Sequence, residues 1–221
     1  MKISVILPTL NEEKSIHSTL EDLFTRHAPE EVIVVDGGSG DKTVSLASEW
    51  TKVILSEKGR ARQMNEGARR AAGDIFLFLH ADTRLPPAGL EKIKEAVRKG
   101  AAGGRFRMRF DRRHWLLSLY ESYTRFHFFS YGDQGFFVTR ELFLVLGGFR
   151  EEALFEDIDF YRRLRRLARP VILKDAVVTS ARRFLQVGKV KQKLINLFLV
   201  ALYYAGFKMS RAKEELYPEV R

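Results

Sequence analysis

The chain has 221 residues and contains no cysteine. The missing thiols exclude disulfide bonds and thiolate metal sites, so packing must hold the fold and any metal must bind to oxygen or imidazole. A chain without disulfides is compatible with the reducing cytoplasm, and we therefore expect a cytoplasmic location.

An apolar stretch long enough to span a bilayer is also missing. The first apolar run, residues 1–8, is too short for the hydrophobic part of a signal peptide, and the acidic Glu12 and Glu13 follow it closely. It predicts a first β-strand instead. The longest run, residues 190–207, falls short of the ~20 apolar residues that a membrane span needs.

This C-terminal run has lysines before it and basic residues after it. Three alternatives remain open: a helix docked on the core, a face for homo-oligomer formation, and an interfacial helix that binds peripherally to the inner face of the membrane. All three predict a C-terminal apolar helix within residues 186–221.

Two familiar nucleotide-binding patterns are absent. No G-x-G-x-x-G follows the first predicted strand, and Asp41 stands where a phosphate loop requires glycine before Lys42 and Thr43. An acid at that position repels phosphate. Internal repeats and low-complexity linkers are missing too, so we expect residues 1–221 to form a single domain.

Positive charge is in excess, with 38 Lys and Arg against 28 Asp and Glu and a formal net charge of +10. The excess favours an anionic partner, such as a nucleoside diphosphate, a nucleic acid or an acidic membrane surface. Charge alone does not choose among these, because surface charge also serves solubility.

Strand-like and helix-like segments alternate through the first half. The apolar runs predict strands at residues 3–7, 32–35, 53–55 and 75–79. Between them we expect a helix capped by Asn11, a second helix that starts near Asp41, and a third over residues 60–72. This alternation predicts an α/β fold with a Rossmann-like, mostly parallel sheet flanked by helices. Ligands bind such sheets beyond the carboxyl ends of the strands.

The second half is less regular. Strands are predicted at residues 103–110 and 135–139, and a short helix ends at Gly147 and Gly148. An aromatic-rich helix over residues 115–129 either lines a cleft or packs in the core, and core packing is favoured because aromatic side chains at helical spacing usually bury. A helix over residues 157–168 ends before a proline.

Polar residues follow the first two predicted strands. Thr9, Asn11 and Glu12 place hydroxyl, amide and carboxylate groups where a nucleoside could bind, although Asn11 alone is explained as a helix cap. Asp36 at the end of the second strand can accept hydrogen bonds from a ribose or base, and glycines such as Gly38 allow close backbone approach.

Two arginines open the third predicted helix. Arg60 and Arg62 are unfavourable for the helix dipole but suit a diphosphate, because helix N-termini attract anions and guanidinium groups bind phosphate oxygens in pairs. A solvated basic surface is the alternative.

The fourth predicted strand ends in His80, Ala81 and Asp82. Residues two apart in a strand point to the same side, so His80 and Asp82 could face one ligand. Carboxylate, diphosphate oxygens and water together suit a hard divalent cation, which makes Asp82 the candidate metal ligand. His80 is either a second ligand, which Mn²⁺ tolerates better than Mg²⁺, or a hydrogen-bonding neighbour.

Glu156 and Asp157 begin the helix predicted after Phe155. Acids at a helix start are ordinarily explained by the dipole. A carboxylate at a cleft can also act as general base for a hydroxyl, so both interpretations stay open.

In this order the segments resemble glycosyltransferase family 2, the inverting enzymes with a GT-A fold. The segments that carry the resemblance are V-I-L-P-T-L-N-E-E, V-V-D-G-G-S-G-D-K-T, G-R-A-R-Q-M-N-E-G-A, F-L-H-A-D-T, G-G-F and E-D-I-D-F. They extend from Ser4 to about Leu167, and short stand-alone members with His-Ala-Asp are most similar. Here His80 replaces the first acid of the family's D-x-D motif.

The resemblance implies a nucleotide-sugar-binding half at residues 1–110, an acceptor and catalytic half at 111–185 and a C-terminal helical segment at 186–221. Asp157 matches the family's catalytic base and Asp82 its metal-binding acid. The implied donor-binding residues are Thr9, Asn11, Glu12, Asp36, Gly38, Arg60, Arg62, His80, Ala81 and Asp82. The implied acceptor residues are Gln134, Glu156 and Arg183.

The implied activity is that of a hexosyltransferase. It would move a sugar from a nucleotide sugar, with UDP as the favoured nucleotide, to an acceptor hydroxyl, with inversion and with Mg²⁺ or Mn²⁺. Nucleic acid is not an expected partner. The alternatives are a nucleotidyltransferase, which would release pyrophosphate, and a non-catalytic basic protein that binds nucleic acid or membrane.

Overall fold

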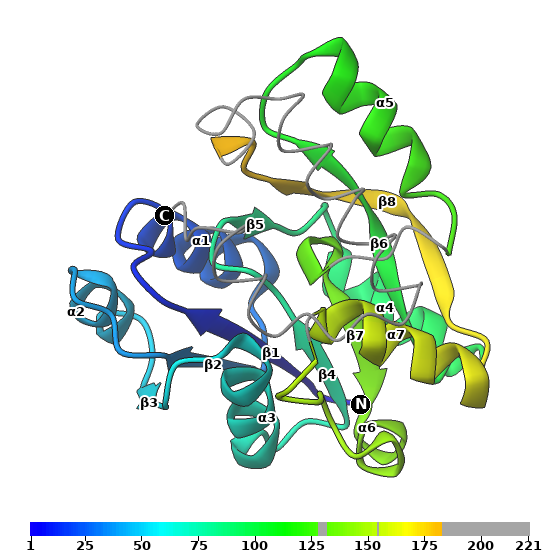
Figure 1. The fold of residues 1–221 in the computed structure, drawn as a ribbon, viewed down its shortest axis with the longest axis horizontal. Coiled ribbons are helices and arrows are strands. Elements are labelled where there is room, and N and C mark those ends of the chain that lie inside the picture. The colour runs from blue at the N-terminus through cyan, green and yellow to red at the C-terminus, as the bar shows by residue number, and fades with distance from the viewer. Residues whose placement is uncertain (128–131, 154, 183–221) are drawn as a thin grey trace.

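The computed structural model describes residues 1–127, 132–153 and 155–182, with the backbone alone for Leu116 (Figure 1). The predicted C-terminal helix, the apolar run at 190–207 and the candidate acceptor residue Arg183 lie outside the described residues.

One mixed sheet runs through the described part of the chain, with eight strands in the order β3-β2-β1-β4-β7-β6-β8-β5. Strands β5 and β7 are antiparallel to their neighbours, and the other six run in one direction. The predicted α/β fold with a mostly parallel sheet is thus confirmed. The strand bounds are β1 Ile3–Thr9, β2 Glu31–Asp36, β3 Val53–Leu55, β4 Ile75–Phe78, β5 Thr83–Arg84, β6 Gly103–Phe110, β7 Phe136–Thr139 and β8 Val171–Thr179.

Helices cover both faces of the sheet (Figure 1). Because side chains alternate along a strand, Ile3, Val5 and Leu7 of β1 enter one core with α1 and α4, whereas Ile6 enters a second core with α3, α6 and α7. The helix bounds are α1 Ile16–Asp22, a π-helical turn η1 Leu23–His27, α2 Thr43–Ser48, α3 Arg60–Arg70, α4 Gly89–Arg98, α5 Trp115–Tyr123, the 3₁₀ turn η2 Gly132–Gln134, α6 Arg140–Leu146 and α7 Glu156–Leu167.

Helix α3 lies unusually close to the sheet at Gly67. A Cβ atom there would stand 2.5 Å from Ile6 Cγ2 and 3.1 Å from Val35 Cγ2, which van der Waals contact does not allow. The missing side chain therefore sets the distance of α3 from β1 and β2. This distance in turn fixes Arg60 at the N-terminal end of the helix, beside the strand ends.

The predicted N-cap at Asn11 is wrong. Helix α1 begins later, after Ser15, and Asn11 has a left-handed backbone with φ of 54°. Its amide donates to Ser39 Oγ at 2.8 Å and its side-chain oxygen accepts from the amide of Gly40 at 2.9 Å. Asn11 therefore joins the loops after β1 and β2 instead of capping a helix.

The helix α4, the strands β5 and β8 and the short turns η1 and η2 have no counterpart in the sequence prediction. Lys174 and Asp175 interrupt the apolar residues of β8, so its nine residues carry no clear strand pattern. The strand forms because β6 pairs with it in parallel over seven registered positions, with an irregularity between Phe106 and Arg107. Tertiary pairing overrides the local signal here.

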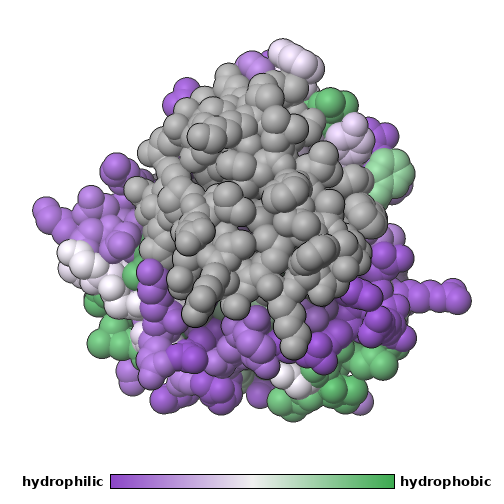
Figure 2. All heavy atoms as spheres, viewed as in Figure 1, coloured by the Kyte–Doolittle hydropathy of each residue, from purple (hydrophilic) through white to green (hydrophobic). Residues whose placement is uncertain are grey.

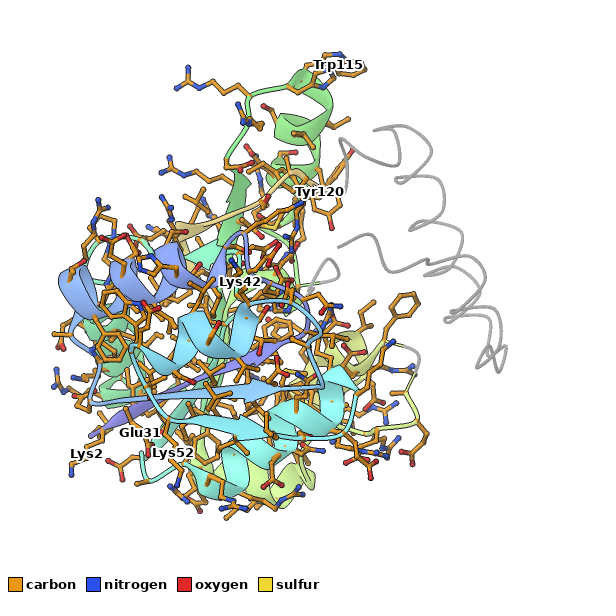
Figure 3. All side chains as sticks on the ribbon, turned by 90° about the vertical axis from the view of Figure 1, so that its left-hand side faces the viewer. Lys2, Glu31, Lys42, Lys52, Trp115 and Tyr120 are labelled. Atoms are coloured by element: carbon orange, nitrogen blue, oxygen red, sulfur yellow. The ribbon has the colours of Figure 1, made fainter. Side chains whose placement is uncertain are left out.

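The aromatic helix α5 is shorter and more exposed than predicted. It ends at Tyr123, and Trp115 is 71% exposed although Leu117 is buried. Figure 3 shows Trp115 at the outer end of α5, away from the Lys2 and Lys52 side of the molecule. The expectation of core packing is wrong for Trp115, because one face of α5 packs on β6 and the opposite face is exposed to solvent.

The described surface visible around the edge of Figure 2 is mostly hydrophilic, with smaller apolar areas between. A charged content of 30% agrees with this distribution. Among the residues that the structure describes, no helix combines the length and apolarity needed to cross a bilayer.

Candidate active site

The loops after β1 and β2 meet at the carboxyl edge of the sheet. Thr9 pairs in register with Asp36, and its hydroxyl donates to Asp36 Oδ2 at 3.1 Å. The same buried carboxylate accepts the amides of Gly38 and Ser39 at 2.9 and 2.8 Å and the hydroxyl of Ser39 at 2.5 Å. Asp36 thus shapes the glycine-rich loop on which Gly38 adopts φ of 91°.

Gln63 of α3 fastens this edge, and sequence reasoning missed it. Its side-chain amide donates to the carbonyls of Thr9 and Val35 at 2.6 and 2.8 Å, and Gly37 would clash with it if it carried a Cβ. The signal was available: Gln63 is a polar residue beside the apolar face of an amphipathic helix. Its bonds connect the start of α3 to both strand ends.

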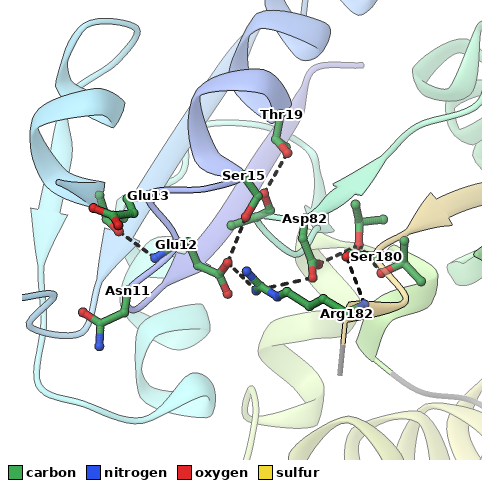
Figure 4. Close-up of polar contacts among 12 residues, drawn as sticks. Asn11, Glu12, Glu13, Ser15, Thr19, Asp82, Ser180 and Arg182 are labelled. Carbon is green, nitrogen blue, oxygen red and sulfur yellow. Dashed lines mark hydrogen bonds and ion pairs between the residues drawn. The ribbon is translucent and has the colours of Figure 1, made fainter. Parts of the chain in front are cut away.

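Glu12, Asp82 and Arg182 form a charged cluster beside this edge (Figure 4). One nitrogen of Arg182, Nη2, lies 2.5 Å from Glu12 Oε2 and 3.6 Å from Asp82 Oδ2. Ser15 donates its hydroxyl to the same Glu12 oxygen at 2.9 Å. The loop after β1, the turn between β4 and β5 and the segment that follows β8 therefore meet at one point.

The surroundings of Asp82 disfavour the ionised form of its side chain. Burial raises its pKa most, and the nearby Glu12 carboxylate raises it further, whereas Arg182 and Arg60 lower it. The preceding Ala81 is buried, and its carbonyl accepts from Thr19 Oγ1 at 2.7 Å, which holds the turn after β4. Additional positive charge beside this carboxylate would therefore stabilise its ionised form.

His80 and Asp157 both lie against Gly132. The Cβ position of Gly132 is 3.0 Å from His80 Nε2 and 3.3 Å from Asp157 Oδ2, so only glycine fits without a shift. The Gly132 amide also donates to Asp157 Oδ2 at 2.6 Å. The turn η2 thereby brings the end of β4 and the start of α7 together.

Glu156 and Asp157 are both buried at the start of α7. Asp157 Oδ1 accepts the Ile158 amide at 2.8 Å, and Arg60 Nη1 lies 3.3 Å from Glu156 Oε1. Burial, followed by the neighbouring Glu156, raises the pKa of Asp157 to about 6, while Arg60 and two backbone amides lower it. This carboxyl is poised to exchange a proton near neutral pH.

Asp133 on η2 is a third acid at this place, and it was not among the predicted site residues. Its Oδ1 is buried and finds no hydrogen-bond partner among the residues that the structure describes. Burial raises its pKa to about 7, with further contributions from Asp157 and Asp82 and an opposing one from Arg60. The signal was an acid within a turn bounded by Gly132 and Gly135; its neighbour Gln134 is fully buried.

The structure thus brings six of the predicted site residues to one region: Glu12, Arg60, His80, Asp82, Glu156 and Asp157. Arg60 joins the acids electrostatically, but Arg62 instead pairs with Glu57 and with Glu151 Oε2, the latter at 2.9 Å. The residues gathered around the acids are Glu12, Arg60, His80, Asp82, Gly132, Asp133, Glu156, Asp157 and Arg182.

The donor set suits a metal that arrives with its substrate. Within the described ranges, no group of three or more His, Asp or Glu side chains could hold a metal ion. Asp82 and Glu12 instead present carboxylates that face one cation, at present a guanidinium. Mg²⁺ commonly binds through one or two carboxylates, substrate phosphates and water, which fits this arrangement.

Comparison with known proteins agrees with the fold. Residues 4–154, more than half of the chain, match the model of glycosyl transferase family 2. The chain therefore belongs to glycosyl transferase family 2, which confirms the resemblance inferred from the sequence.

Individual relatives share part of the chain. A dolichol-phosphate mannosyltransferase from Pyrococcus furiosus is 38% identical over 122 residues, covering 48% of this chain and 34% of the relative. The chain therefore spans well under two thirds of that relative's length.

Solved structures share the fold at low identity. TarS from S. aureus in complex with UDP-GlcNAc gives a TM-score of 0.67 at 22% identity, covering 81% of this chain and 58% of that one. The mannosyltransferase PcManGT from Pyrobaculum calidifontis, in complex with GDP-Man and Mn²⁺, gives 0.64 at 22% identity, covering 91% and 64%. These likenesses support a GT-A-like fold.

Proposed function

We propose that this chain transfers a sugar from a nucleoside diphosphate sugar, with UDP as the favoured nucleotide, to an acceptor hydroxyl with inversion. The observation that carries the proposal is the convergence of Asp82 and Asp157. These acids come from distant parts of the chain, and Gly132 lies against both Asp157 Oδ2 and His80 Nε2, two residues before Asp82. Both acids also raise the pKa of Asp133. Family membership and the nucleotide-sugar complexes of TarS and PcManGT support the same reaction class.

The donor would lie along the carboxyl edge of the sheet. Thr9, Asn11, Asp36 and Gly38 belong to the two joined loops that would take the nucleoside. Arg60 at the start of α3 would bind the diphosphate, since both the guanidinium and the helix N-terminus favour anions. The contacts of Arg62 with two glutamates make it a weaker candidate for this role.

Asp82, with Glu12 beside it, would hold Mg²⁺ or Mn²⁺ together with the diphosphate. Such a cation, when bound, neutralises the negative charge that develops on the departing nucleoside diphosphate. Complexes of PcManGT with Mn²⁺ and of a mycobacterial glucosyl-3-phosphoglycerate synthase with Mg²⁺ support this choice of cofactor. Arg182 would add positive charge at the same place.

Asp157 would act as the general base. Its carboxylate would accept the proton of the acceptor hydroxyl as the oxygen attacks the anomeric carbon, opposite the bond to the departing phosphate. A single displacement of this kind inverts the configuration at that carbon. Gln134 and Glu156 flank Asp133 and Asp157 in the chain and would border the acceptor; Arg183, outside the described residues, is proposed for the same pocket.

A thermal-shift panel tests the donor and the cofactor. Ligands that bind only the native state raise its apparent stability by RT ln(1 + [L]/Kd). We expect one class among UDP-, GDP- and dTDP-sugars to raise the Tm, and to do so more strongly with Mn²⁺ than with EDTA. If none of the donors shifts the Tm in either condition, the proposed function is wrong.

Asp82→Asn tests the metal-binding role. The neutral amide is a poorer ligand for a hard cation, so the part of the Tm shift that depends on Mn²⁺ should fall by at least half while the shift in EDTA persists. Asp175→Asn is the matched control, because Asp175 of β8 pairs with Lys92 of α4 and is not one of the site residues. An unchanged Mn²⁺ dependence in the Asp82 variant would remove the metal-binding role.

Asp157→Asn tests the base. General base catalysis contributes ~10²–10⁴-fold to rate, so transfer should fall by that factor while the donor-induced Tm shift stays close to that of the wild type. The readout is transfer by the wild type and the variant side by side, with the donor chosen by the panel. Full transfer by the variant would exclude Asp157 from the mechanism.

A further inference from the structure

One guanidinium nitrogen of Arg182 contacts both carboxylates that the proposed function gives to the metal (Figure 4). Its Nη2 atom lies 2.5 Å from Glu12 Oε2 and 3.6 Å from Asp82 Oδ2. Burial and then the Glu12 carboxylate raise the pKa of Asp82, whereas Arg182 lowers it, as expected when a cation offsets the repulsion of two acids. The guanidinium therefore acts as a counter-ion for this pair of acids.

The charged groups of this cluster are within reach of solvent. The side chains of Glu12, Asp82 and Arg182 are 15%, 19% and 25% exposed, so water and small ions can approach them. Partly exposed ion pairs are weak because solvent screens their charges. A ligand that binds the carboxylates or the guanidinium more strongly can therefore separate them.

The backbone that carries Arg182 is held in place by the sheet. Thr179 of β8 pairs with Thr83 of β5, and their hydroxyl oxygens lie 3.1 Å apart. Ala181 is fully buried, and its amide donates to Asp111 Oδ1 at 2.9 Å. The guanidinium can thus change its partners by rotation of the long arginine side chain, without movement of the strand.

The charges decide which cations the two carboxylates can hold together. Two carboxylates and one guanidinium carry a formal charge of −2 + 1 = −1. A divalent cation beside the guanidinium would set three positive charges against two negative ones, and the two cations would repel each other. A nucleoside diphosphate removes this conflict, because its phosphate oxygens bind both a divalent metal and an arginine.

We propose that Arg182 occupies the place of the divalent cation in the free protein, and that the donor diphosphate takes over its guanidinium when the metal enters. The inference rests on the proposed function and adds to it the order in which the ligands assemble. Arg182 keeps the affinity for free metal low and makes metal binding depend on the donor. Such coupling is reciprocal, so the metal strengthens donor binding by the same factor.

Titration of Mn²⁺ into the free protein and into protein saturated with UDP measures this coupling. Isothermal titration gives both Kd values, and electron paramagnetic resonance of unbound Mn²⁺ gives them where binding is weak. In Arg182→Gln we expect Mn²⁺ alone to bind about tenfold more tightly, because a competing hydrogen-bonded cation is gone. A merely structural role predicts the opposite, since a distorted site binds metal more weakly.

The second expected change concerns the nucleotide. With saturating Mn²⁺, UDP should bind Arg182→Gln about tenfold more weakly than the wild type, because its diphosphate has lost a charged donor. The ratio of the Mn²⁺ Kd values without and with UDP should fall in the same variant. Arg182→Met, which also lacks the charge, should behave in the same way and provides a second neutral variant.

Three controls separate occupation of the cation place from a general effect of charge. Arg182→Lys keeps a positive charge and should keep the low affinity of the free protein for Mn²⁺. Arg60→Gln removes a charge that also acts on Asp82, but Arg60 belongs to α3 and pairs with Glu156 at 3.3 Å. It should weaken UDP binding without a tenfold gain for free Mn²⁺. Arg98→Gln, at an exposed position at the end of α4, should keep the wild-type values.

The outcomes are distinguishable. An unchanged or lower affinity of Arg182→Gln and Arg182→Met for free Mn²⁺ overturns the inference and leaves the transferase proposal intact. An equal gain in Arg60→Gln also overturns it, because the effect would then be one of general charge. Unchanged UDP binding by both neutral variants excludes the transfer of the guanidinium to the diphosphate. If the wild type binds neither Mn²⁺ nor UDP, alone or together, the proposed function itself fails.

Discussion

At the scale of single residues, the site is defined by acids whose neighbours oppose ionisation. Burial raises the pKa values of Asp82, Asp133 and Asp157, and a neighbouring carboxylate raises each of them further: Glu12 for Asp82, Glu156 for Asp157, and both Asp157 and Asp82 for Asp133. Arg60 offsets part of this rise at all three. Such groupings are common at active sites, where a shifted pKa matches a group to proton transfer or ligand binding.

The pH dependence of transfer follows from Asp157. A general base must be unprotonated to accept a proton. We therefore expect kcat/KM to be low at acidic pH and to rise as the pH passes the Asp157 pKa of about 6. Burial is the main cause of the raised pKa of Asp157, and the Glu156 charge adds to it, so Glu156→Gln should move the rising limb to lower pH. The measurement is kcat/KM from pH 4.5 to 8 at constant free Mn²⁺. If the midpoint of the rising limb is the same in Glu156→Gln and in the wild type, the limb reports the ionisation of a group other than Asp157.

The site residues that the sequence predicted are marked by their local position in the chain, whereas those that it missed depend on long-range contacts. Asp82 and Asp157 stand at the end of a strand and the start of a helix, and both places are visible in the sequence. Asp133 and Gln63 gain their roles from segments far away in the chain, Asp133 from the acids beside it and Gln63 from two strand ends. No local pattern encodes such contacts.

At the scale of elements, β6 is connected to the wall of the site through Arg105. This arginine is fully buried and donates to the carbonyls of Phe106, Thr124 and Phe126 at 3.0, 2.7 and 2.8 Å. Its guanidinium carbon lies 5.7 Å from the ring centroid of Tyr161 on α7. One side chain thus holds β6, the end of α5 and α7 together.

Arg105→Met should destabilise the protein by about 2–4 kcal/mol, because buried carbonyls lose their donors. Arg105→Lys should recover only part of the loss, since an ammonium group lacks the planar fork of a guanidinium. Urea unfolding followed by circular dichroism measures both. Wild-type stability in the Met variant would show that these hydrogen bonds contribute nothing net.

The elements themselves were predictable where periodicity was strong. The strands β1 to β4 and the helices α3 and α7 were predicted to within two or three residues of their bounds, because apolar spacing marks them clearly. The strand β8 was missed because Lys174 and Asp175 break its pattern, and pairing with β6 determines it.

At the scale of the whole molecule, Asp133 links the site to global stability. Its folded-state pKa of about 7 lies above the ordinary aspartate value, so the folded protein binds this proton more tightly than the unfolded chain does. The resulting stability is complete below pH 4 and is lost as the pH rises towards 7.

Asp133→Asn should therefore raise the Tm of the metal-free protein at pH 8 by several degrees, with the gain shrinking as the pH falls towards 4. Differential scanning calorimetry in EDTA at both pH values measures it, with Asp175→Asn as the control. A destabilised variant at pH 8 would contradict the burial argument.

The strand order has a consequence for biosynthesis. Strand β4 pairs on one side with β1 and on the other with β7, which lies far downstream at Phe136–Thr139. A nascent chain that has emerged only as far as residue 110 therefore exposes an unpaired strand edge, and such edges invite association with other chains. Strand β7 must be synthesised before it can pair with β4 of residues 1–110. We therefore expect residues 1–110 and 111–185 to fold as one cooperative unit rather than one after the other.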